Sequence, residues 1–336
     1  MRTAVIGAGR MGMRHVEVVK SLGLPLVGLC DAKPEALEAA GKAGVPSEAL
    51  FASFDDLLAR GRPECVVIST TAPSHAELTI RSAQSGARAI LCEKPMATSL
   101  ADCDRMLAAC EKAGTRLAIN HQMRFMEQYT LPKSLADSEQ YGGLASVTVV
   151  GGNFGIAMNG SHYFEMFRYL TGEAPTQATA WFSPGKLPNP RGPQFEDRAG
   201  SVRLETASGK RFFMDVSADQ GHGVRVTYAC RFGQIMVDEL AGIMLTSVRK
   251  PEHREMPTTR YGMPWVDETH KITPADAVAP SRAVLSALLD GKNFPTGQDA
   301  RQAIAALVGC YTSDERNHTP VPLDRDLDQK RTFPWA

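Results

Sequence analysis

The first third of the chain alternates short apolar runs, typical of buried strands, with segments whose apolar residues recur at helical spacing. The strand-like runs are residues 3–7, 24–30, 64–70, 89–92 and 116–120, and the helical segments between them are 10–22, 34–43, 75–85 and 99–113. Strands covered on both faces lack polar alternation, so this order predicts βαβ units around a parallel sheet. We therefore expect an α/β domain with a doubly wound parallel sheet over residues 1–119.

Serines and glycines mark the ends of several of these helices. A serine followed three residues later by an acid has the spacing at which the serine side chain caps a helix. The chain has this spacing at Ser53 and Asp56, Ser74 and Glu77, and Ser99 and Asp102. Glycines that can end a helix follow at Gly23, Gly44, Gly86 and Gly114.

The pattern changes after residue 120. Residues 201–218 read as two alternating strands joined by the turn ASGK, and residues 161–171 read as a strong helix. Further strands are predicted at 145–150, 176–182, 224–230 and 234–238, helices at 280–291 and 297–315, and Pro-rich polar loops at 183–199 and 249–275. Residues 120–336 are therefore predicted to form an α+β domain with an open, largely antiparallel sheet.

Length and composition limit the classes of partner. With 336 residues and 43% apolar residues, the chain can bury two cores. The chain has 37 basic residues (lysine plus arginine) and 37 acidic residues (aspartate plus glutamate). It therefore has no excess of positive charge that would indicate nucleic-acid binding. Seven cysteines without a C-x-x-C pair favour reduced, buried thiols over a zinc site or disulfides, and no metal site is predicted. A strand begins at once and no apolar span reaches membrane length, so we expect a cytoplasmic protein with a small-molecule ligand.

The turn after the first predicted strand carries a dinucleotide-binding pattern. VIGAGRMG places Gly7, Gly9 and Gly12 in a G-x-G-x-x-G that follows a strand and opens a helix. Such glycines allow a tight turn, close approach of the backbone to a pyrophosphate, and packing of the helix on the strand. The alternative is that they serve a tight βα turn alone.

Asp31 ends the second predicted strand at the distance expected of a ribose-binding acid. Its carboxylate would bind the adenosine ribose hydroxyls and repel a 2′-phosphate, which favours NAD over NADP. Lys33 and Arg10 lie close enough in sequence to weaken that preference, so NADP remains the alternative cofactor. Asp31 could instead be a solvated turn acid before Pro34.

Polar residues follow two further strands at the edge where open parallel sheets bind ligands. The third strand ends in STTAPSHAEL, where Thr70, Thr71 and Pro73 would let backbone lie beside a cofactor. The fourth strand ends in AILCEKPMATS, so Glu93 and Lys94, both costly to bury, must lie at its end. His75 could be a surface or a functional histidine.

Together, GAGRMG, the strand-end Asp31, TTAPSHAEL, SGARAILCEKPMA and NHQMRF resemble the Gfo/Idh/MocA family of NAD(P)-dependent oxidoreductases. The resemblance covers almost the whole chain. It implies a Rossmann domain and an open-sheet domain that mediates dimers or tetramers, with sugars or cyclitols as substrates. The cofactor residues it implies are Gly7, Gly9, Arg10, Met11, Gly12, Asp31, Thr70, Thr71, Pro73, His75, Glu93, Lys94 and Asn120.

The resemblance also implies the reacting residues. Lys94 is expected to contact both the cofactor ribose and the substrate hydroxyl, before a peptide that is often cis in relatives; the alternative is a surface ion pair with Glu93. A histidine at the position of His162 commonly acts as general base, and we expect both side chains to reach one cleft beside the nicotinamide. The substrate-binding residues implied are Lys94, Arg124, Asn159, His162 and Glu165.

One position departs from the family pattern. Relatives have an aspartate four residues before the histidine, and this chain has Met158 there, with Asn159 one place away. A neutral amide can orient an imidazole but cannot stabilise imidazolium as a carboxylate does. The alternative for His162 is a helix-capping or packing role.

Three functions are consistent with these residues. The first is a dehydrogenase that transfers a hydride between a sugar or cyclitol carbon and NAD. The second is a redox-neutral glycosidase, epimerase or dehydratase that keeps NAD bound and oxidises its substrate transiently. The third is a non-catalytic ligand-binding protein. A homodimer or homotetramer is expected in each case, because an open sheet with helices on one face leaves the other face to be covered.

Overall fold

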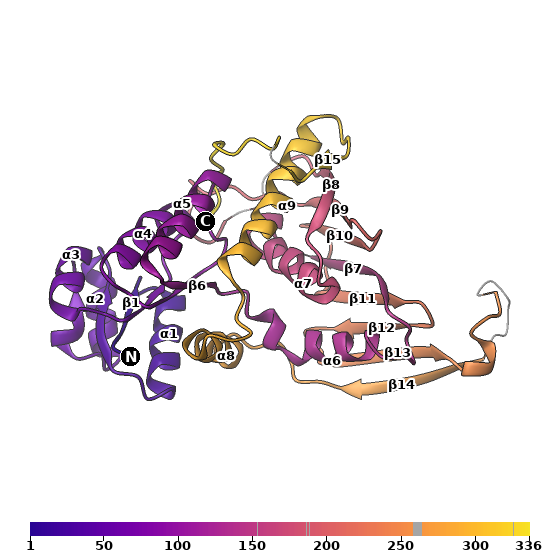
Figure 1. Cartoon of the computed structure of the whole chain (residues 1–336), viewed down its shortest axis with the longest axis horizontal. Coiled ribbons are helices and arrows are strands. Elements are labelled where there is room, and N and C mark those ends of the chain that lie inside the picture. Colours follow the sequence, from indigo (N-terminus) through magenta and orange to yellow (C-terminus); the bar gives the residue numbers. More distant parts are fainter. Residues whose placement is uncertain (153, 186, 188, 258–263, 325) are drawn as a thin grey trace. The chain divides into compact units, whose positions relative to one another are not determined.

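The chain folds around two β-sheets, each belonging to a separate unit (Figure 1). The computed structural model describes residues 1–336 except 153, 186, 188, 258–263 and 325. The first unit comprises Met1–Gln122, Asp276–Ile304 and Asp328–Ala336, and the second comprises Met123–Ala275 and Ala305–Leu327. The sequence boundaries assign residues 276–304 and 328–336 to the second half, whereas both stretches cluster with the first unit. Helix α8 (Val278–Asp290) packs on α1 (Arg10–Ser21), and the backbone of residues 328–336 bonds to Thr98 and Ala101.

The first unit contains a six-stranded parallel sheet in the order β3-β2-β1-β4-β5-β6. Its strands are β1 (Thr3–Ile6), β2 (Leu26–Cys30), β3 (Leu50–Phe51), β4 (Cys65–Ile68), β5 (Ala89–Cys92) and β6 (Arg116–Ile119). The other helices are α2 (Pro34–Lys42), α3 (Phe54–Asp56) with the π-turn η2 (Leu57–Gly61), α4 (His75–Gln84) and α5 (Leu100–Ala113). Every residue of β1, β4 and β5 is buried, which confirms the doubly wound fold predicted from continuous apolar runs.

Two of the three predicted serine caps are confirmed. The side chains of Ser53 and Ser99 accept hydrogen bonds from the backbone N–H groups of Asp56 and Asp102. The Ser74 cap is wrong, because a 3₁₀ turn (η3, Ala72–Ser74) precedes α4 and gives Ser74 helical backbone angles. Its hydroxyl instead lies 2.7 Å from Thr70 Oγ1 and 2.9 Å from the carbonyl oxygen of Thr71.

The second unit contains a nine-stranded sheet in the order β14-β13-β12-β11-β7-β10-β9-β8-β15. Its strands are β7 (Leu144–Gly152), β8 (Pro175–Phe182), β9 (Gly200–Thr206), β10 (Arg211–Ser217), β11 (Arg225–Cys230), β12 (Gly233–Asp238), β13 (Ile243–Arg249), β14 (Trp265–Lys271) and β15 (Val321–Pro322). All neighbouring strands are antiparallel except β7 and β10, so the largely antiparallel prediction is confirmed.

Strand β14 lies within the predicted loop 249–275, and that prediction is wrong over Trp265–Lys271. Six of the seven β14 residues are exposed, so the strand has no buried alternation to mark it. It is held by backbone pairing with β13 along its whole length. Residues 258–263 of the same predicted loop lie outside the described residues.

Helices cover one face of the second sheet. They are α6 (Glu127–Ala136), α7 (Ser161–Thr171), which continues the π-turn η5 (Ile156–Gly160), and α9 (Gly297–Glu315), which begins in the first unit. Phe164 and Phe167 of α7 pack on Phe212 of β10, with ring centroids 5.7 and 5.5 Å apart. The next residue in β10, Phe213, points to the opposite face and is exposed, as the strand period requires.

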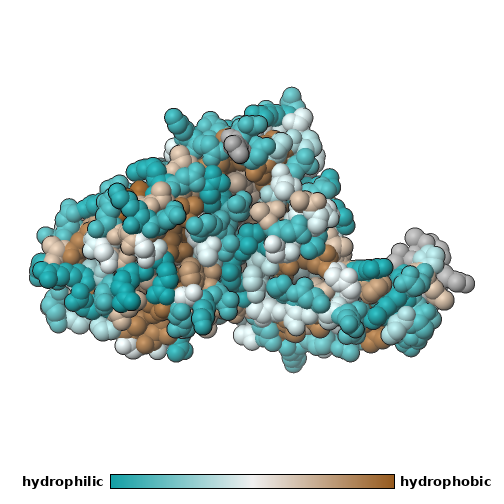
Figure 2. All heavy atoms as spheres, in the orientation of Figure 1, coloured by the Kyte–Doolittle hydropathy of each residue, from teal (hydrophilic) through white to brown (hydrophobic). Residues whose placement is uncertain are grey.

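The face of the molecule in Figure 2 is largely hydrophilic, with smaller hydrophobic areas between the polar side chains. Within the described residues, no helix has both the length and the apolar character that a bilayer span requires.

The turn between β1 and α1 excludes side chains at two glycines. Gly7 has φ of +95°, a conformation that residues with a Cβ rarely adopt. A Cβ on Gly12 would lie 1.7 Å from the backbone oxygen of Gly7, which cannot move aside. The helix and the turn therefore touch directly at Gly12.

We expect Gly12→Ala to lower the free energy of unfolding by about 1–3 kcal/mol or more, the cost of overpacking. Gly41→Ala is the matched control, because Gly41 lies inside α2 and its added Cβ would meet only Leu50 Cδ1 at 3.5 Å. That change should stabilise the protein by about 0.5–1 kcal/mol. Urea unfolding followed by circular dichroism measures both, and equal stability of the two variants would contradict the prediction.

Candidate active site

The glycine turn opens onto free space at the start of α1. A Cβ built on Gly9 meets nothing within 4 Å, and no side chain caps the helix there. Arg10 is exposed and Met11 is half-buried in the first helical turn. Backbone N–H groups at such a helix start attract phosphate, so the residues present fit a dinucleotide pyrophosphate.

Asp31 fixes the glycine turn to the end of β2. Its Oδ2 accepts a hydrogen bond from Ala8 N at 2.7 Å, and its Oδ1 accepts one from Lys33 N at 2.9 Å. A half-buried carboxylate held at both oxygens differs from the solvated turn acid that the sequence left open. Asp31 therefore lies beside the proposed phosphate-binding turn, where the adenosine ribose of a dinucleotide binds in this fold.

His75 is buried rather than on the surface. Its Nδ1 lies 3.0 Å from the backbone oxygen of Pro95, and its Nε2 lies 3.2 Å from that of Thr70. The ring thus links the segment after β4 to the segment after β5. Thr71 is half-buried and Pro73 exposed, so these two residues, rather than the His75 ring, border solvent at this edge.

A buried hydrogen-bond network surrounds Glu93 at the end of β5. His15 Nε2 of α1 and Asn120 Nδ2 each lie 2.8 Å from Glu93 Oε1. Asn120 Nδ2 also lies 3.1 Å from Ser281 Oγ of α8. The backbone N–H of Lys94 donates to Glu93 Oε2 at 3.3 Å. Three segments distant in sequence therefore meet at one carboxylate, and α8 is joined to them through Asn120.

These contacts keep Glu93 ionised. Burial by itself would raise the pKa of this carboxyl, but the His15 and Asn120 hydrogen bonds and the His15 and Lys94 charges together lower it to about 2. Glu93 is 4% exposed and Lys94 is 9% exposed, which rules out the surface ion pair considered from sequence. The Lys94–Pro95 peptide is cis.

In the second unit, His162 lies in the first turn of α7 and is buried. One turn later, Glu165 is fully buried and accepts hydrogen bonds from Arg124 and, at 3.2 Å, from Arg168. The Arg124 guanidinium also stacks on the Tyr169 ring at 4.9 Å. Arg124 and Glu165, both predicted to bind substrate, thus bind each other and fix α7.

A carboxylate from a distant loop occupies the start of the segment that carries Met158. Asp197 is buried, and its two oxygens accept hydrogen bonds from Ala157 N and Met158 N, each at 2.8 Å. A Cβ on Gly155 would lie 2.0 Å from this carboxylate. Asp197 could not be identified from the sequence, because an acid in a polar loop gives no signal of a partner 39 residues away.

Asn159 lines a pocket of about 170 Å³ together with Asp197. The remaining wall is Phe154, Gly155, Met158, Leu187, Asn189 and Pro190. Two amides and a carboxylate beside apolar walls suit a hydroxyl-rich ring. His162 and this pocket belong to the second unit, whereas Lys94 belongs to the first, so their shared cleft stays a prediction.

Cysteine and metal chemistry receive no support from the described residues. All seven cysteines are unpaired and six are buried. Burial raises the pKa of Cys30 to about 11 and that of Cys65 to about 12, so these thiols stay protonated at neutral pH. Over the same described residues, no three His, Cys, Asp or Glu side chains group as metal ligands.

The chain is similar to known oxidoreductases. Residues 1–121 match the model of an oxidoreductase family with an NAD-binding Rossmann fold, Gfo/Idh/MocA. The chain is 28% identical to an inositol 2-dehydrogenase of Streptomyces avermitilis over 73% of this chain and 74% of that protein. It is 41% identical to the D-apiose dehydrogenase of Paraburkholderia graminis, but over only 36% of this chain and 32% of that enzyme.

The whole fold has solved counterparts. An oxidoreductase from Agrobacterium radiobacter, crystallised with NAD⁺, L-tartaric acid and magnesium, superposes with a TM-score of 0.80 at 20% identity. The superposition covers 96% of this chain and 98% of that one. The glycine turn, the strand-end acid, the Glu93-Lys94-Pro95 edge and these matches agree: residues 1–121 match the NAD-binding Rossmann domain of the Gfo/Idh/MocA oxidoreductase family.

Proposed function

We propose that this protein is an NAD-dependent dehydrogenase that transfers a hydride between a CH–OH carbon of a sugar or cyclitol and the nicotinamide. The observation that carries the proposal is Lys94 beside the buried, ionised Glu93 at the carboxyl edge of the parallel sheet. Ligands bind at that edge in open α/β sheets. Relatives named as inositol and D-apiose dehydrogenases support the same reaction and substrate class.

The glycine turn and Asp31 would hold the cofactor. Gly9 lets backbone N–H groups approach the pyrophosphate, and Asp31 lies where it can accept hydrogen bonds from the ribose hydroxyls. Thr70, Thr71 and Pro73 would border the cofactor on the side of β4. Bound NAD supplies the hydride acceptor for oxidation, and its reduced form supplies the donor for the reverse reaction.

Lys94 and His162 would handle the reacting oxygen and its proton. The Lys94 ammonium binds the hydroxyl oxygen and stabilises the negative charge that develops as the proton leaves. The His162 imidazole takes that proton as general base. Glu93 accepts a hydrogen bond from the backbone N–H of Lys94 and would hold this backbone in place.

The remaining predicted residues receive separate roles. Asn159 lines the pocket with Asp197 and would contact substrate hydroxyls directly. Arg124 and Glu165 would position α7 through their buried ion pair, and Asn120 would position Glu93. We expect the protein to act in the cytoplasm, where thiols such as its seven unpaired cysteines stay reduced.

The Asp31 role predicts tighter binding of NADH than of NADPH. Asp31→Asn keeps an acceptor for Ala8 N but removes the charge, so the preference should fall toward equality. Glu38→Gln, which removes a charge from the exposed face of α2, is the control and should leave the preference unchanged. Intrinsic fluorescence titration measures all affinities; equal or reversed wild-type affinities would refute the assignment.

Lys94→Ala and His162→Ala should each slow NADH formation by about 10²- to 10⁴-fold, the usual contribution of acid–base groups. The histidine variant should keep its NAD affinity within a few-fold, which fluorescence titration checks. His270→Ala in the outer strand β14 serves as control. Rates come from absorbance at 340 nm with a panel of sugars, sugar nucleotides and cyclitols, and full activity of His162→Ala would refute its role as base.

The same panel separates the alternatives. Substrate conversion without accumulation of NADH would favour a redox-neutral reaction, and binding without conversion would favour a non-catalytic protein.

The uncovered face of the second sheet predicts self-association. On the face opposite the helices, one row of side chains crosses five neighbouring strands. It consists of Phe213, Thr148, Thr227, Met236 and Leu245. Trp181 on the same face is 47% exposed. We expect a homodimer or homotetramer through this face, and Phe213→Asp combined with Leu245→Asp should yield monomers. Light scattering at micromolar concentration measures the molar mass of both proteins, and a monomeric wild type would contradict the expectation.

A further inference from the structure

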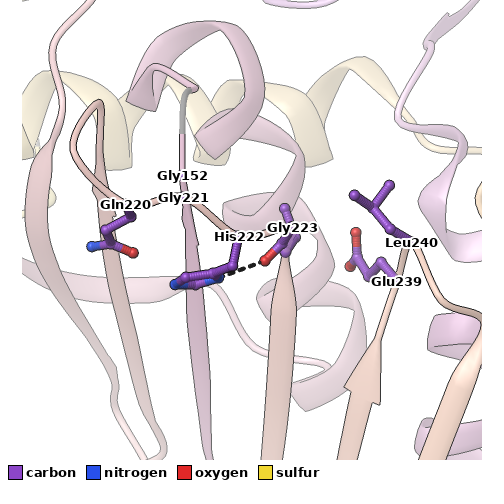
Figure 3. A pocket seen from close by; sticks show the side chains of 8 residues that line it. Gly152, Gln220, Gly221, His222, Gly223, Glu239 and Leu240 are labelled. Atoms are coloured by element: carbon purple, nitrogen blue, oxygen red, sulfur yellow. Dashed lines mark hydrogen bonds between the residues drawn. The ribbon is translucent and has the colours of Figure 1, made fainter.

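A second, larger pocket of about 450 Å³ lies in the second unit at the end of β7 (Figure 3). Its wall comes from Gly152, the loop from Gln220 to Val224 between β10 and β11, and the residues Glu239 and Leu240 that follow β12. Glu239 is the one acid and His222 the one imidazole among the lining residues that the structure describes. Lysine and arginine are absent from that set, so Glu239 is its one anionic group and His222 its one titratable base.

Two tyrosine hydroxyls hold the carboxyl of Glu239 in place. It is 7% exposed, and its oxygens accept hydrogen bonds from the hydroxyls of Tyr129 in α6 and, at 3.0 Å, of Tyr163 in α7. Its backbone N–H donates to the carbonyl oxygen of Val224 at 3.1 Å. An ionised carboxylate can accept about four hydrogen bonds, so two tyrosines leave acceptor capacity for a ligand.

The walls are set by backbone contacts. A Cβ on Gly152 would lie 1.7 Å from the backbone oxygen of Gln220, so the loop rests directly on the end of β7. The His222 Nδ1 lies 2.8 Å from the carbonyl oxygen of Gly223, which turns the ring along the loop, as Figure 3 shows. Contacts within the chain itself therefore define the walls of the pocket.

Glu239 lacks the counter-charge that a buried acid requires. Among the described residues it forms no ion pair, and the groups facing it are Tyr129, Tyr163, Tyr228 of β11 and the neighbouring acid Asp238. Burial raises the pKa of Glu239 to about 7, against the lowering effect of the two tyrosine hydrogen bonds. A cation delivered by a ligand would supply the missing charge and favour the ionised form.

We propose that this pocket binds the protonated amino group of an amino-substituted sugar or cyclitol, with Glu239 as its anionic partner. The proposal rests on the dehydrogenase function for its substrate class, and Tyr163 connects the two sites, because it follows His162 in α7 and bonds Glu239. A neutral polyol would leave Glu239 without a counter-charge, and an acidic ligand would be repelled.

Calorimetric titration of the NADH-loaded protein with scyllo-inosamine and scyllo-inositol, which differ by one amino group for one hydroxyl, tests the proposal. At about pH 8, where Glu239 is ionised, the amine should bind at least about tenfold more tightly. At about pH 6 the carboxyl is protonated and the preference should shrink. Equal affinities at about pH 8, or no measurable binding of the amine, would overturn the proposal.

Glu239→Gln should abolish the preference while leaving the inositol affinity within about threefold, because the amide keeps an acceptor for tyrosine but carries no charge. Asp238→Asn removes the adjacent, more exposed acid, which pairs with Arg225, and should keep the preference. A preference that survives Glu239→Gln refutes the pocket. If Glu239→Gln fails to fold, the wild-type pH dependence decides alone.

The outcomes separate the two proposals. NADH formation from inositol with no amine preference retains the dehydrogenase and rejects the pocket. Amine binding that depends on Glu239, with no NADH formed from any polyol, retains the pocket and rejects the proposed reaction.

Discussion

The ionised carboxylate of Glu93 joins separate segments of the first unit. A buried charge is expensive unless it is paired and hydrogen-bonded, and the partners of Glu93 come from α1, from the residue after β6 and from the lysine that follows it. Asn120 extends this set to Ser281 of α8. The helix that starts at the glycine turn, the strand end that carries Lys94 and the returning helix are thus joined through two side chains, Glu93 and Asn120.

The fold was predictable where apolar residues run continuously or alternate regularly along the chain. Continuous apolar runs gave β1, β4 and β5, and alternation gave the hairpin of β9 and β10. Strand β14 was not predicted, because nearly all its side chains face solvent and only backbone pairing defines it. Helix α6 was not predicted, because Pro132 lies inside it and its apolar pattern is weak. Ser74 has the spacing of a cap, but the preceding 3₁₀ turn changes its backbone angles.

The residues of the candidate site also divide into those that could be predicted from the sequence and those that could not. Gly7, Gly9, Gly12, Asp31, Glu93 and Lys94 are readable because short local motifs carry them. His15, Asp197, Glu239 and Ser281 are not, because each acquires its role from a partner 39 or more residues away that only the folded chain brings near. Buried polar groups of this kind have no sequence period, so the chemistry that they add becomes visible only with the tertiary structure.

The first unit is assembled from three stretches of the chain, and this has a consequence for biosynthesis. A ribosome completes residues 1–122 long before it reaches α8, so α1 and Asn120 must wait through the synthesis of Met123–Ala275 for the helix that carries Ser281. During that interval the nascent sheet lacks one of its covering helices. Any fragment ending near residue 122 is in the same state, so the boundary that looks natural in the sequence is a poor place to truncate the protein for expression.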